Sequence, residues 1–209
     1  MKSCEKGRSM IEMLGVLAIV GVLSVGGIAG YSKAMKKVRS EKTTSQVNEL
    51  IMNIRNLYAH QTQGYKDISA QLLININQVP IGMYDPENPT LGLRNAYGGK
   101  VIIFESKDIS GGAHAFELYV TGLDKETCVI MATLEWGYDP SSGFEAMYIG
   151  TSEPTTPLLL DVHTPTDSVP ANGIFTPGIH QDSIPISIPK AMSVCSCSAH
   201  ECVIGLKYL

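Results

Sequence analysis

The first part of the chain is a nearly continuous apolar run. Residues 10–31 are almost all hydrophobic, and Glu12 is the single charged side chain among them. A helix needs about 20 such residues to cross the hydrocarbon core of a bilayer. The run therefore predicts a membrane-spanning helix over residues 8–31. A carboxylate inside such a segment is energetically costly and usually functional, so Glu12 is the first candidate functional residue.

Beyond residue 31 the apolar pattern changes from continuous to periodic. Apolar residues recur at three- and four-residue steps, which marks one buried face of a helix. This stripe consists of Val47, Leu50, Ile51, Ile54, Leu57 and Tyr58. Because the chain has no proline before Pro80, we expect one helix from about Ser9 to His60. Its second part, residues 32–60, is amphipathic and is expected to pack on the rest of the protein.

Residues 61–209 have the shorter and mixed patterns of a globular head. Helical spacing predicts a short helix over residues 68–76 and another over residues 124–136. Apolar runs bounded by turn residues predict strands, which we expect at residues 101–104, 115–120, 146–149, 158–162, 184–188 and 203–206. The expected fold class is α+β, with the long N-terminal helix packed on an antiparallel β-sheet head.

Two glycine-containing turns organise the first strands of this predicted sheet. The sequence Asn-Ala-Tyr-Gly-Gly at residues 95–99 precedes the strand at 101–104. Ser-Gly-Gly at residues 110–112 then separates this strand from the one at 115–120. Because glycine and asparagine favour tight turns, the two strands are expected to form a hairpin.

Composition narrows the possible function classes. The net charge is −4, with 17% charged and 44% hydrophobic residues. Nucleic-acid binding depends on an excess of clustered Lys and Arg, and this overall balance offers no electrostatic case for it. The sequence contains no P-loop, H-E-x-x-H or G-x-S-x-G motif. We therefore predict no enzyme activity, no cofactor and no nucleic-acid partner.

The cysteines indicate an oxidising compartment. Beyond Cys4 the chain has four, namely Cys128, Cys195, Cys197 and Cys202, and an even number suggests two disulfides. A Cys195–Cys197 bridge would close a very small ring, so this bridge combined with Cys128–Cys202 is the least favoured pairing. Two pairings stay open: Cys128–Cys195 with Cys197–Cys202, and Cys128–Cys197 with Cys195–Cys202.

A zinc site is the alternative interpretation of the cysteine cluster. Cys195, Cys197, His200 and Cys202 are ligand types that zinc prefers, and they lie within eight residues. Zinc sites normally combine a C-x2-C pair with distant ligands, and this spacing is missing here. Disulfides are therefore expected, and no metal site is predicted.

The residues around Glu12 resemble the processing site of type IV pilin precursors. In that family a glycine precedes the cut and a glutamate is the fifth residue of the mature chain, which corresponds here to Gly7 and Glu12. Gly21 falls at mature position 14, where the family commonly has glycine. Arg8 would be the new first residue, where an apolar residue is more usual. Residues 1–7, with Lys2 and Lys6, would form a short basic leader.

The middle of the chain is similar to the head of type IVb pilins. There a turn of the Asn-Pro-Trp-Gly-Gly type precedes the first strand, and Asn95-Ala96-Tyr97-Gly98-Gly99 matches it with Ala-Tyr in place of Pro-Trp. In these pilins a cysteine on the helix after the second strand is bridged to a C-terminal cysteine. Cys128 occupies that place, and the resemblance extends from Gly7 to about Trp136.

The resemblance implies a structural function with several partners. A prepilin peptidase would cleave after Gly7 and create an α-amine on Arg8, which the family usually methylates. Glu12 of one subunit would pair with the Arg8 amine of its neighbour in a homo-oligomeric filament. The precursor would lie in the bacterial inner membrane, and assembly machinery would build it into a filament outside the cell.

Other interpretations of the N-terminal segment make different predictions. An ordinary secretory signal would have a shorter apolar core without Glu12. A single-pass anchor for an extracytoplasmic ligand-binding head is the main functional alternative. The cations after the run outnumber those before it, and the positive-inside rule would then place the head in the cytoplasm. These are Lys33, Lys36, Lys37, Arg39 and Lys42, against Lys2, Lys6 and Arg8. The processing site and the cysteines instead favour export of the head. The cations after the apolar run are then expected to bind phospholipid phosphates.

Overall fold

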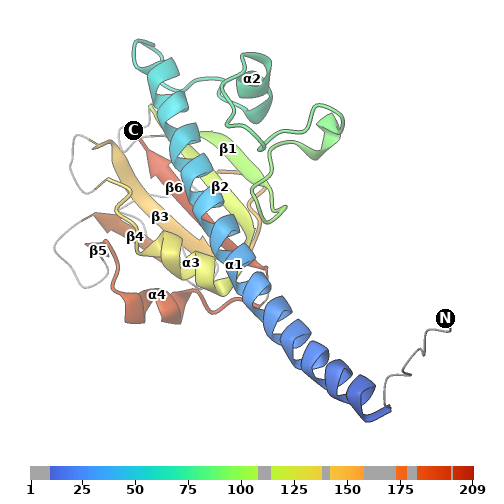
Figure 1. Cartoon of the computed structure of the whole chain (residues 1–209). Helices are drawn as coiled ribbons and strands as arrows, with labels where there is room; N and C mark the ends of the chain where they lie inside the picture. The colour runs from blue at the N-terminus through green and yellow to red at the C-terminus, as the bar shows by residue number, and fades with distance from the viewer. Residues whose placement is uncertain (1–9, 108–113, 138–141, 158–172, 178–182, 199) are drawn as a thin grey trace. The chain divides into compact units, whose positions relative to one another are not determined.

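The computed structural model describes residues 10–107, 114–137, 142–157, 173–177, 183–198 and 200–209. The helices are α1 (Met10–Tyr58), α2 (Ala70–Asn75), the 3-10 helix η1 (Pro89–Leu91), α3 (Lys125–Ala132) and α4 (Ile188–Val194). The strands are β1 (Val101–Ser106), β2 (Ala115–Leu123), β3 (Phe144–Gly150), β4 (Ile174–Pro177), β5 (Ser183–Ile184) and β6 (Cys202–Tyr208) (Figure 1). Contacts divide the chain into an N-terminal unit that ends at Glu41 and a head, Lys42–Leu209.

The predicted long helix is present as α1, which has 49 residues and no break. In its N-terminal half the apolar side chains point into solvent: Ile11 is 80% exposed, Leu17 64% and Ile28 70%. By length and composition this part is able to cross a membrane, and none of its most apolar window is buried. The sequence pattern predicted both the helix and its exposed apolar surface.

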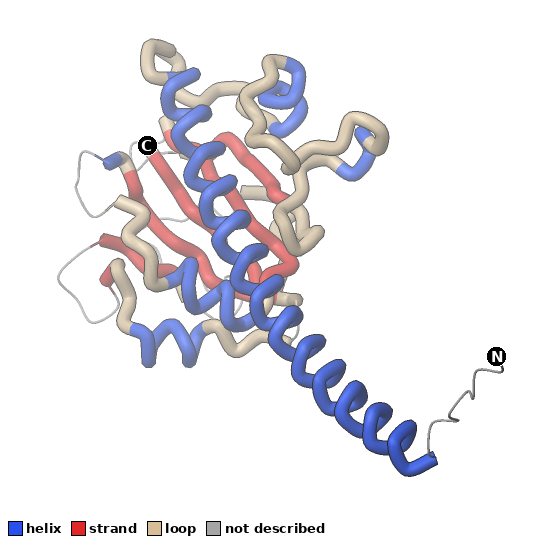
Figure 2. The backbone as a smooth tube through the Cα atoms, viewed as in Figure 1, coloured by secondary structure: helices blue, strands red, loops and turns tan. Residues whose placement is uncertain are grey.

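The second half of α1 supplies the centre of the head's hydrophobic core. Val47, Leu50 and Ile54 are completely buried and Ile51 nearly so, as the stripe predicted. Leu57 is 36% exposed, so the buried stripe ends about one turn before the helix does. Figure 2 shows this part of α1 crossing one face of the sheet.

The sheet has the strand order β1-β2-β6-β3-β4-β5. The pairs β1–β2, β2–β6, β6–β3 and β3–β4 are antiparallel. Strand β5 pairs with β4 in parallel at the edge of the sheet. Leu206 of β6 pairs with Leu118 of β2 on one side and with Met147 of β3 on the other. All three side chains are fully buried in the main core. The predicted hairpin of β1 and β2 is confirmed, with Val101 opposite Val120.

A second cluster of buried side chains consists of Tyr119, Ala146, Tyr148 and Val203. Glycines make room for its rings: a Cβ on Gly205 would lie 2.4 Å from Cε1 of Tyr119. The cluster is bordered by a buried ion pair in which Lys207 Nζ lies 2.8 Å from Glu145 Oε2. Ser106 donates a hydrogen bond of 2.7 Å to the buried Glu117 carboxylate.

Two sequence predictions about the head need correction. The helix expected over residues 124–136 ends at Ala132. The strand predicted at 184–188 is wrong, because only Ile184 belongs to β5 and Ile188 begins α4. Proline explains the error: Pro185 has no N–H for a ladder, and proline early in α4 suits a helix start.

Some elements were missed or cannot be compared. Strand β4 at Ile174–Pro177 and helix α4 at Ile188–Val194 were not predicted. The turn predicted at residues 110–112 and the strand predicted at 158–162 lie outside the described residues. The strands predicted at 146–149 and 203–206 are confirmed as parts of β3 and β6.

Candidate functional site

The N-terminal half of α1 is the first candidate site. Glu12 lies in the first turn of the helix, where the positive end of the helix dipole favours a carboxylate. Its helical neighbours are apolar and exposed, with Val16 one turn away at 52% and the adjacent Met13 at 48%. A carboxylate carried by such a surface needs a partner from outside the helix once lipid or other helices cover it. Gly7 and Arg8 lie outside the described residues.

The second candidate site is a disulfide clamp at the end of the head. Cys128 on α3 is bonded to Cys195 directly after α4, with Cα atoms 5.9 Å apart. Cys197 is bonded to Cys202, the first residue of β6, with Cα atoms 5.4 Å apart. This is one of the two pairings that the sequence left open. The clamp therefore joins α3, α4 and the central strand.

Three sulfur atoms of the clamp also lie close enough together to be considered as metal ligands. The Sγ atoms of Cys128, Cys197 and Cys202 lie within 4.8 Å of one another. Zinc binds thiolates, and a sulfur atom in a disulfide is not one. His200, the other candidate ligand, is exposed and has a φ of 61°. The arrangement is that of a structural clamp.

Asparagine 95 organises the turn at residues 95–99. Its side-chain amide donates a hydrogen bond of 2.7 Å to the carbonyl of Thr121, and its Oδ1 accepts from the backbone N–H of Tyr97 at 2.8 Å. Asn95 is 4% exposed, so these bonds satisfy a buried polar group. The turn residues thereby fix the entry of β1 against β2.

The two glycines of this turn have separate causes. Gly98 has a φ of +81°, a conformation that favours glycine. Gly99 lies so close to β2 that a Cβ on it would be 1.8 Å from the carbonyl oxygen of Thr121. No side chain fits in that space. The Gly-Gly pair that carried the resemblance is thus required by backbone conformation at Gly98 and by close packing at Gly99.

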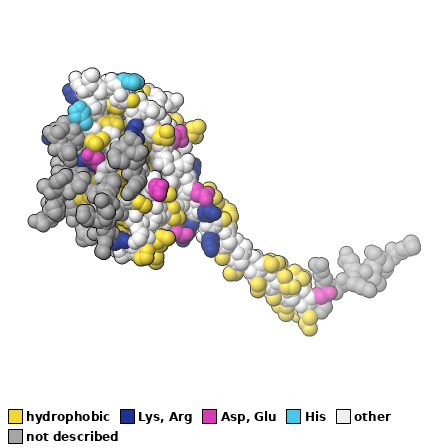
Figure 3. All heavy atoms as spheres, turned by 90° about the vertical axis from the view of Figure 1, so that its left-hand side faces the viewer, with side chains coloured by type: hydrophobic (Ala, Val, Ile, Leu, Met, Phe, Trp, Pro, Cys, Tyr) yellow, Lys and Arg dark blue, Asp and Glu magenta, His cyan; other side chains and the backbone are white. Residues whose placement is uncertain are grey.

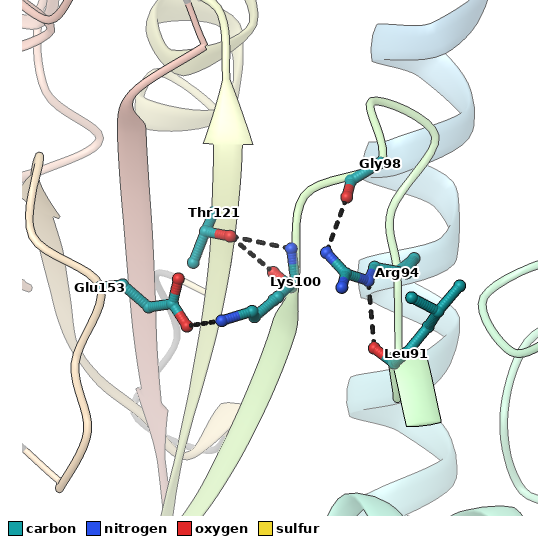
Figure 4. A network of polar contacts seen from close by, with 6 residues as sticks. All are labelled: Leu91, Arg94, Gly98, Lys100, Thr121 and Glu153. Atoms are coloured by element: carbon teal, nitrogen blue, oxygen red, sulfur yellow. Dashed lines mark hydrogen bonds and ion pairs between the residues drawn. The ribbon is translucent and has the colours of Figure 1, made fainter. Parts of the chain in front are cut away.

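Arg94 and Lys100 frame the turn on its exposed side (Figure 4). Arg94 donates from Nε to the carbonyl of Leu91 at 3.1 Å and from Nη1 to the carbonyl of Gly98 at 3.0 Å. Lys100 forms an ion pair with Glu153, which follows β3. These contacts connect the turn to η1 and to the segment after β3.

Tyr97 and Tyr208 make two further hydrogen bonds, one next to the clamp and one at the far end of β6. The Tyr97 hydroxyl lies 2.6 Å from Thr127 Oγ1 on α3. Tyr208 on β6 donates a hydrogen bond of 2.8 Å to the carbonyl of Trp136. Burial holds the pKa of Tyr208 far above its ordinary value, and the nearby Arg55 opposes this only in part. The sequence pattern carried no signal for these hydrogen-bond partners.

The fold of this chain, a long helix with an antiparallel sheet, is similar to that of solved type IV pilins. The crystal structure of TcpA, a type IV pilin from Vibrio cholerae El Tor biotype, matches with a TM-score of 0.53 and 16% identity. The match covers 82% of this chain and 99% of TcpA. A type IVb pilin from Salmonella typhi matches with a TM-score of 0.50 and 14% identity, over 79% and 97% of the two chains. These structures show a type IV pilin fold.

Sequence comparison gives the family. Residues 32–202 match the bundlin family. The major structural subunit of the bundle-forming pilus of Escherichia coli O127:H6 (strain E2348/69 / EPEC) is 31% identical over 136 residues. These residues are 65% of this chain and 68% of that subunit. The chain belongs to the bundlin family, and it is a structural subunit of a pilus and not an enzyme. The comparisons favour this function over a membrane-anchored ligand-binding protein.

Proposed function

We propose that the chain is made as an inner-membrane precursor that is cleaved after Gly7 and then built into a surface filament through α1. In this proposal residues 1–7 are the leader and residues 8–31 are first the membrane span and later the filament core. Residues 32–60 continue the helix into the head, and residues 61–209 complete the head. A prepilin peptidase and the pilus assembly machinery are the expected partners.

The exposed apolar half of α1 is the observation that carries this proposal. The side chains of Leu17, Leu23 and Ile28 are 64–70% exposed in the isolated chain. Burying each of them removes apolar surface from water and stabilises the buried state by about 1.5–3 kcal/mol. Lipid covers this surface before assembly, and the same helices of other subunits cover it afterwards. The head needs no such partner for its own core.

The pairing of Glu12 with the Arg8 amine would set the register between subunits. Cleavage after Gly7 leaves a positive α-amine at the start of the apolar helix, and Glu12 supplies the opposite charge one turn later. Both groups become buried in a bundle of apolar helices, where each strongly prefers a partner. A subunit that joins the filament in a different axial register would leave the Glu12 carboxylate and the Arg8 amine without their partners.

Cleavage is tested by expressing the full chain with and without a prepilin peptidase. The expected product with the peptidase begins at Arg8 when its N-terminus is sequenced, and its first residue is N-methylated. A chain that keeps Met1 in the presence of the active peptidase would contradict the proposed processing site.

Register control is tested with Glu12 variants in a strain that assembles this pilus. Glu12→Ala and Glu12→Gln are expected to remain membrane-bound and folded but to yield few or no filaments, measured by shearing and electron microscopy. Glu41→Gln is the matched control, because Glu41 is an exposed glutamate of the same helix. Abundant filaments from Glu12→Ala would overturn this role of Glu12.

A further inference from the structure

The segment of α1 directly after the apolar run is strongly basic in a chain that is acidic overall. Residues 33–41 contain Lys33, Lys36, Lys37 and Arg39 with a single carboxylate, Glu41, whereas the whole chain has a net charge of −4. Figure 3 shows the hydrophobic side chains of the N-terminal part of α1 and the Lys and Arg side chains that follow them. The four cationic residues are exposed.

The helix places these four cations on one side. With 3.6 residues per turn, Lys33, Lys36, Lys37 and Arg39 fall on an arc of about 160°. Ala34, Met35 and Val38 fall on the opposite arc. This stretch is therefore amphipathic, with a cationic face defined by Lys33, Lys36, Lys37 and Arg39 and an apolar face behind it.

The spacing along the helix matches the dimensions of a bilayer. At 1.5 Å per residue the axis from Met10 to Tyr31 is about 32 Å long, and the hydrocarbon core is about 30 Å thick. Tyr31, 68% exposed, then falls at the boundary, where aromatic side chains with a polar end are favoured. The cations begin about 3 Å beyond it. Their long side chains are able to reach the phosphates.

We infer that the cationic face of α1 binds the phosphates of anionic phospholipids in the leaflet at the C-terminal end of the span. This inference rests on the proposed membrane stage and adds a ligand class to it. Lysine offers three donors and arginine a planar fork that matches phosphate. The Lys37–Glu41 pair does not compete strongly, because its atoms are 3.8 Å apart and both side chains are largely exposed.

The binding would explain why export proceeds against the positive-inside rule. Cations beyond a span normally retain that end in the cytoplasm. Anionic headgroups in the receiving leaflet compensate the charge once the cationic face has crossed. Release of the subunit into the filament then requires these lipid contacts to be given up, so leaflet composition would influence both insertion and extraction.

The experiment uses the full chain in phosphatidylcholine bilayers with spin-labelled phosphatidylglycerol or spin-labelled phosphatidylcholine as probe. Electron paramagnetic resonance measures how strongly each probe is retained at the protein. The wild-type chain is expected to prefer phosphatidylglycerol by about three- to tenfold, the order expected for a few cations near a surface. The preference should fall at high salt, because screening weakens exposed charges.

Charge-matched variants locate the effect. The triple variant K33Q/K36Q/K37Q is expected to lose most of the preference. The triple variant K66Q/K107Q/K125Q, which neutralises exposed lysines of the head, should keep it. Equal retention of both probes by the wild-type chain, or equal loss in both variants, would overturn the lipid site. A chain that does not integrate into the bilayer would instead overturn the membrane stage and, with it, this inference.

Discussion

The two ends of α1 both carry apolar side chains, but these side chains have opposite surroundings. Leu17, in the N-terminal unit, is 64% exposed, whereas Leu50, in the head, is completely buried. The difference lies in the pattern. A continuous apolar run makes every side of the helix hydrophobic, and it needs lipid or other helices around it. A periodic stripe makes one side hydrophobic, and a single sheet is enough to cover it.

This comparison separates what the chain does alone from what it does with other copies. The head buries its own core and is held by its own disulfides. The N-terminal unit has no such internal core among its described residues. Substitutions in the head should therefore change the free energy of unfolding of the single chain. Substitutions in the N-terminal unit should leave it nearly unchanged. Trp136, the single tryptophan and 5% exposed, reports on the head.

The largest expected effect comes from the longer disulfide. Removing Cys128–Cys195 with C128S/C195S should lower the free energy of unfolding by about 4 kcal/mol, because this bridge closes a long loop in the unfolded chain. Cys197–Cys202 closes a short loop, and its removal with C197S/C202S should cost about 2 kcal/mol. Denaturant unfolding in detergent, followed by Trp136 fluorescence, measures both. Equal losses of stability in the two variants would mean that loop length does not determine how much each disulfide stabilises the head.

The next effect compares two leucines of one helix. Leu50→Ala should lower the free energy of unfolding of the head by about 3 kcal/mol, because it removes buried methyl groups and leaves a cavity. Leu17→Ala should change it by less than about 0.5 kcal/mol, as for an exposed position. The same denaturant titration applies. A similar loss at both positions would show that the N-terminal unit contributes to the stability of the single chain.

Two glycines provide a smaller contrast. Gly99→Ala should cost about 2 kcal/mol, because its Cβ would collide with a backbone carbonyl that cannot rotate away. A Cβ on Gly15 would meet no other atom within 4 Å. Gly15→Ala should therefore leave head unfolding unchanged, and it should make the helix itself more stable by about 1 kcal/mol. Thermal circular dichroism separates the two transitions.

The smallest effect concerns alkaline pH. Burial raises the pKa of Tyr208 above its ordinary value, so at high pH the unfolded chain ionises before the folded head does. The stabilisation that comes from the protonated Tyr208 is fully present below about pH 10. Above that value the free energy of unfolding should fall by roughly 1.4 kcal/mol per pH unit. Tyr208→Phe should reduce this slope. An unchanged slope in Tyr208→Phe would contradict the view that Tyr208 causes the loss of stability at high pH.

The elements that the sequence predicted best depend on local pattern alone. The 49-residue helix α1 follows from its apolar run and stripe, and β1 and β2 follow from short apolar runs between turns. Helix α4 was missed because Ile184, Ile186 and Ile188 alternate as in a strand, although Pro185 interrupts this run and Pro189 follows it. Strand β4 has four residues, too few for a clear alternation.

The candidate site shows the same limit. The cysteines were identified as two disulfides, but the choice between two pairings depended on how α3 packs beside α4. Cys128 and Cys195 are 67 residues apart in sequence, and no local pattern reports such a contact. The role of Asn95 was similarly hidden, because its partner Thr121 lies on β2. Close packing at Gly99 has a sequence signal, the Gly-Gly pair, but its cause appears only in three dimensions.

The position of β6 has a consequence for the timing of folding. This strand is the last of the sheet in the chain, yet it lies in the middle, between β2 and β3. When such a chain is threaded through a membrane with its N-terminal helix retained, β6 crosses after every other strand. Until it arrives, β2 and β3 have no shared neighbour and the head cannot close. In a chain exported in this way, the sheet of the head closes only after its last strand has arrived.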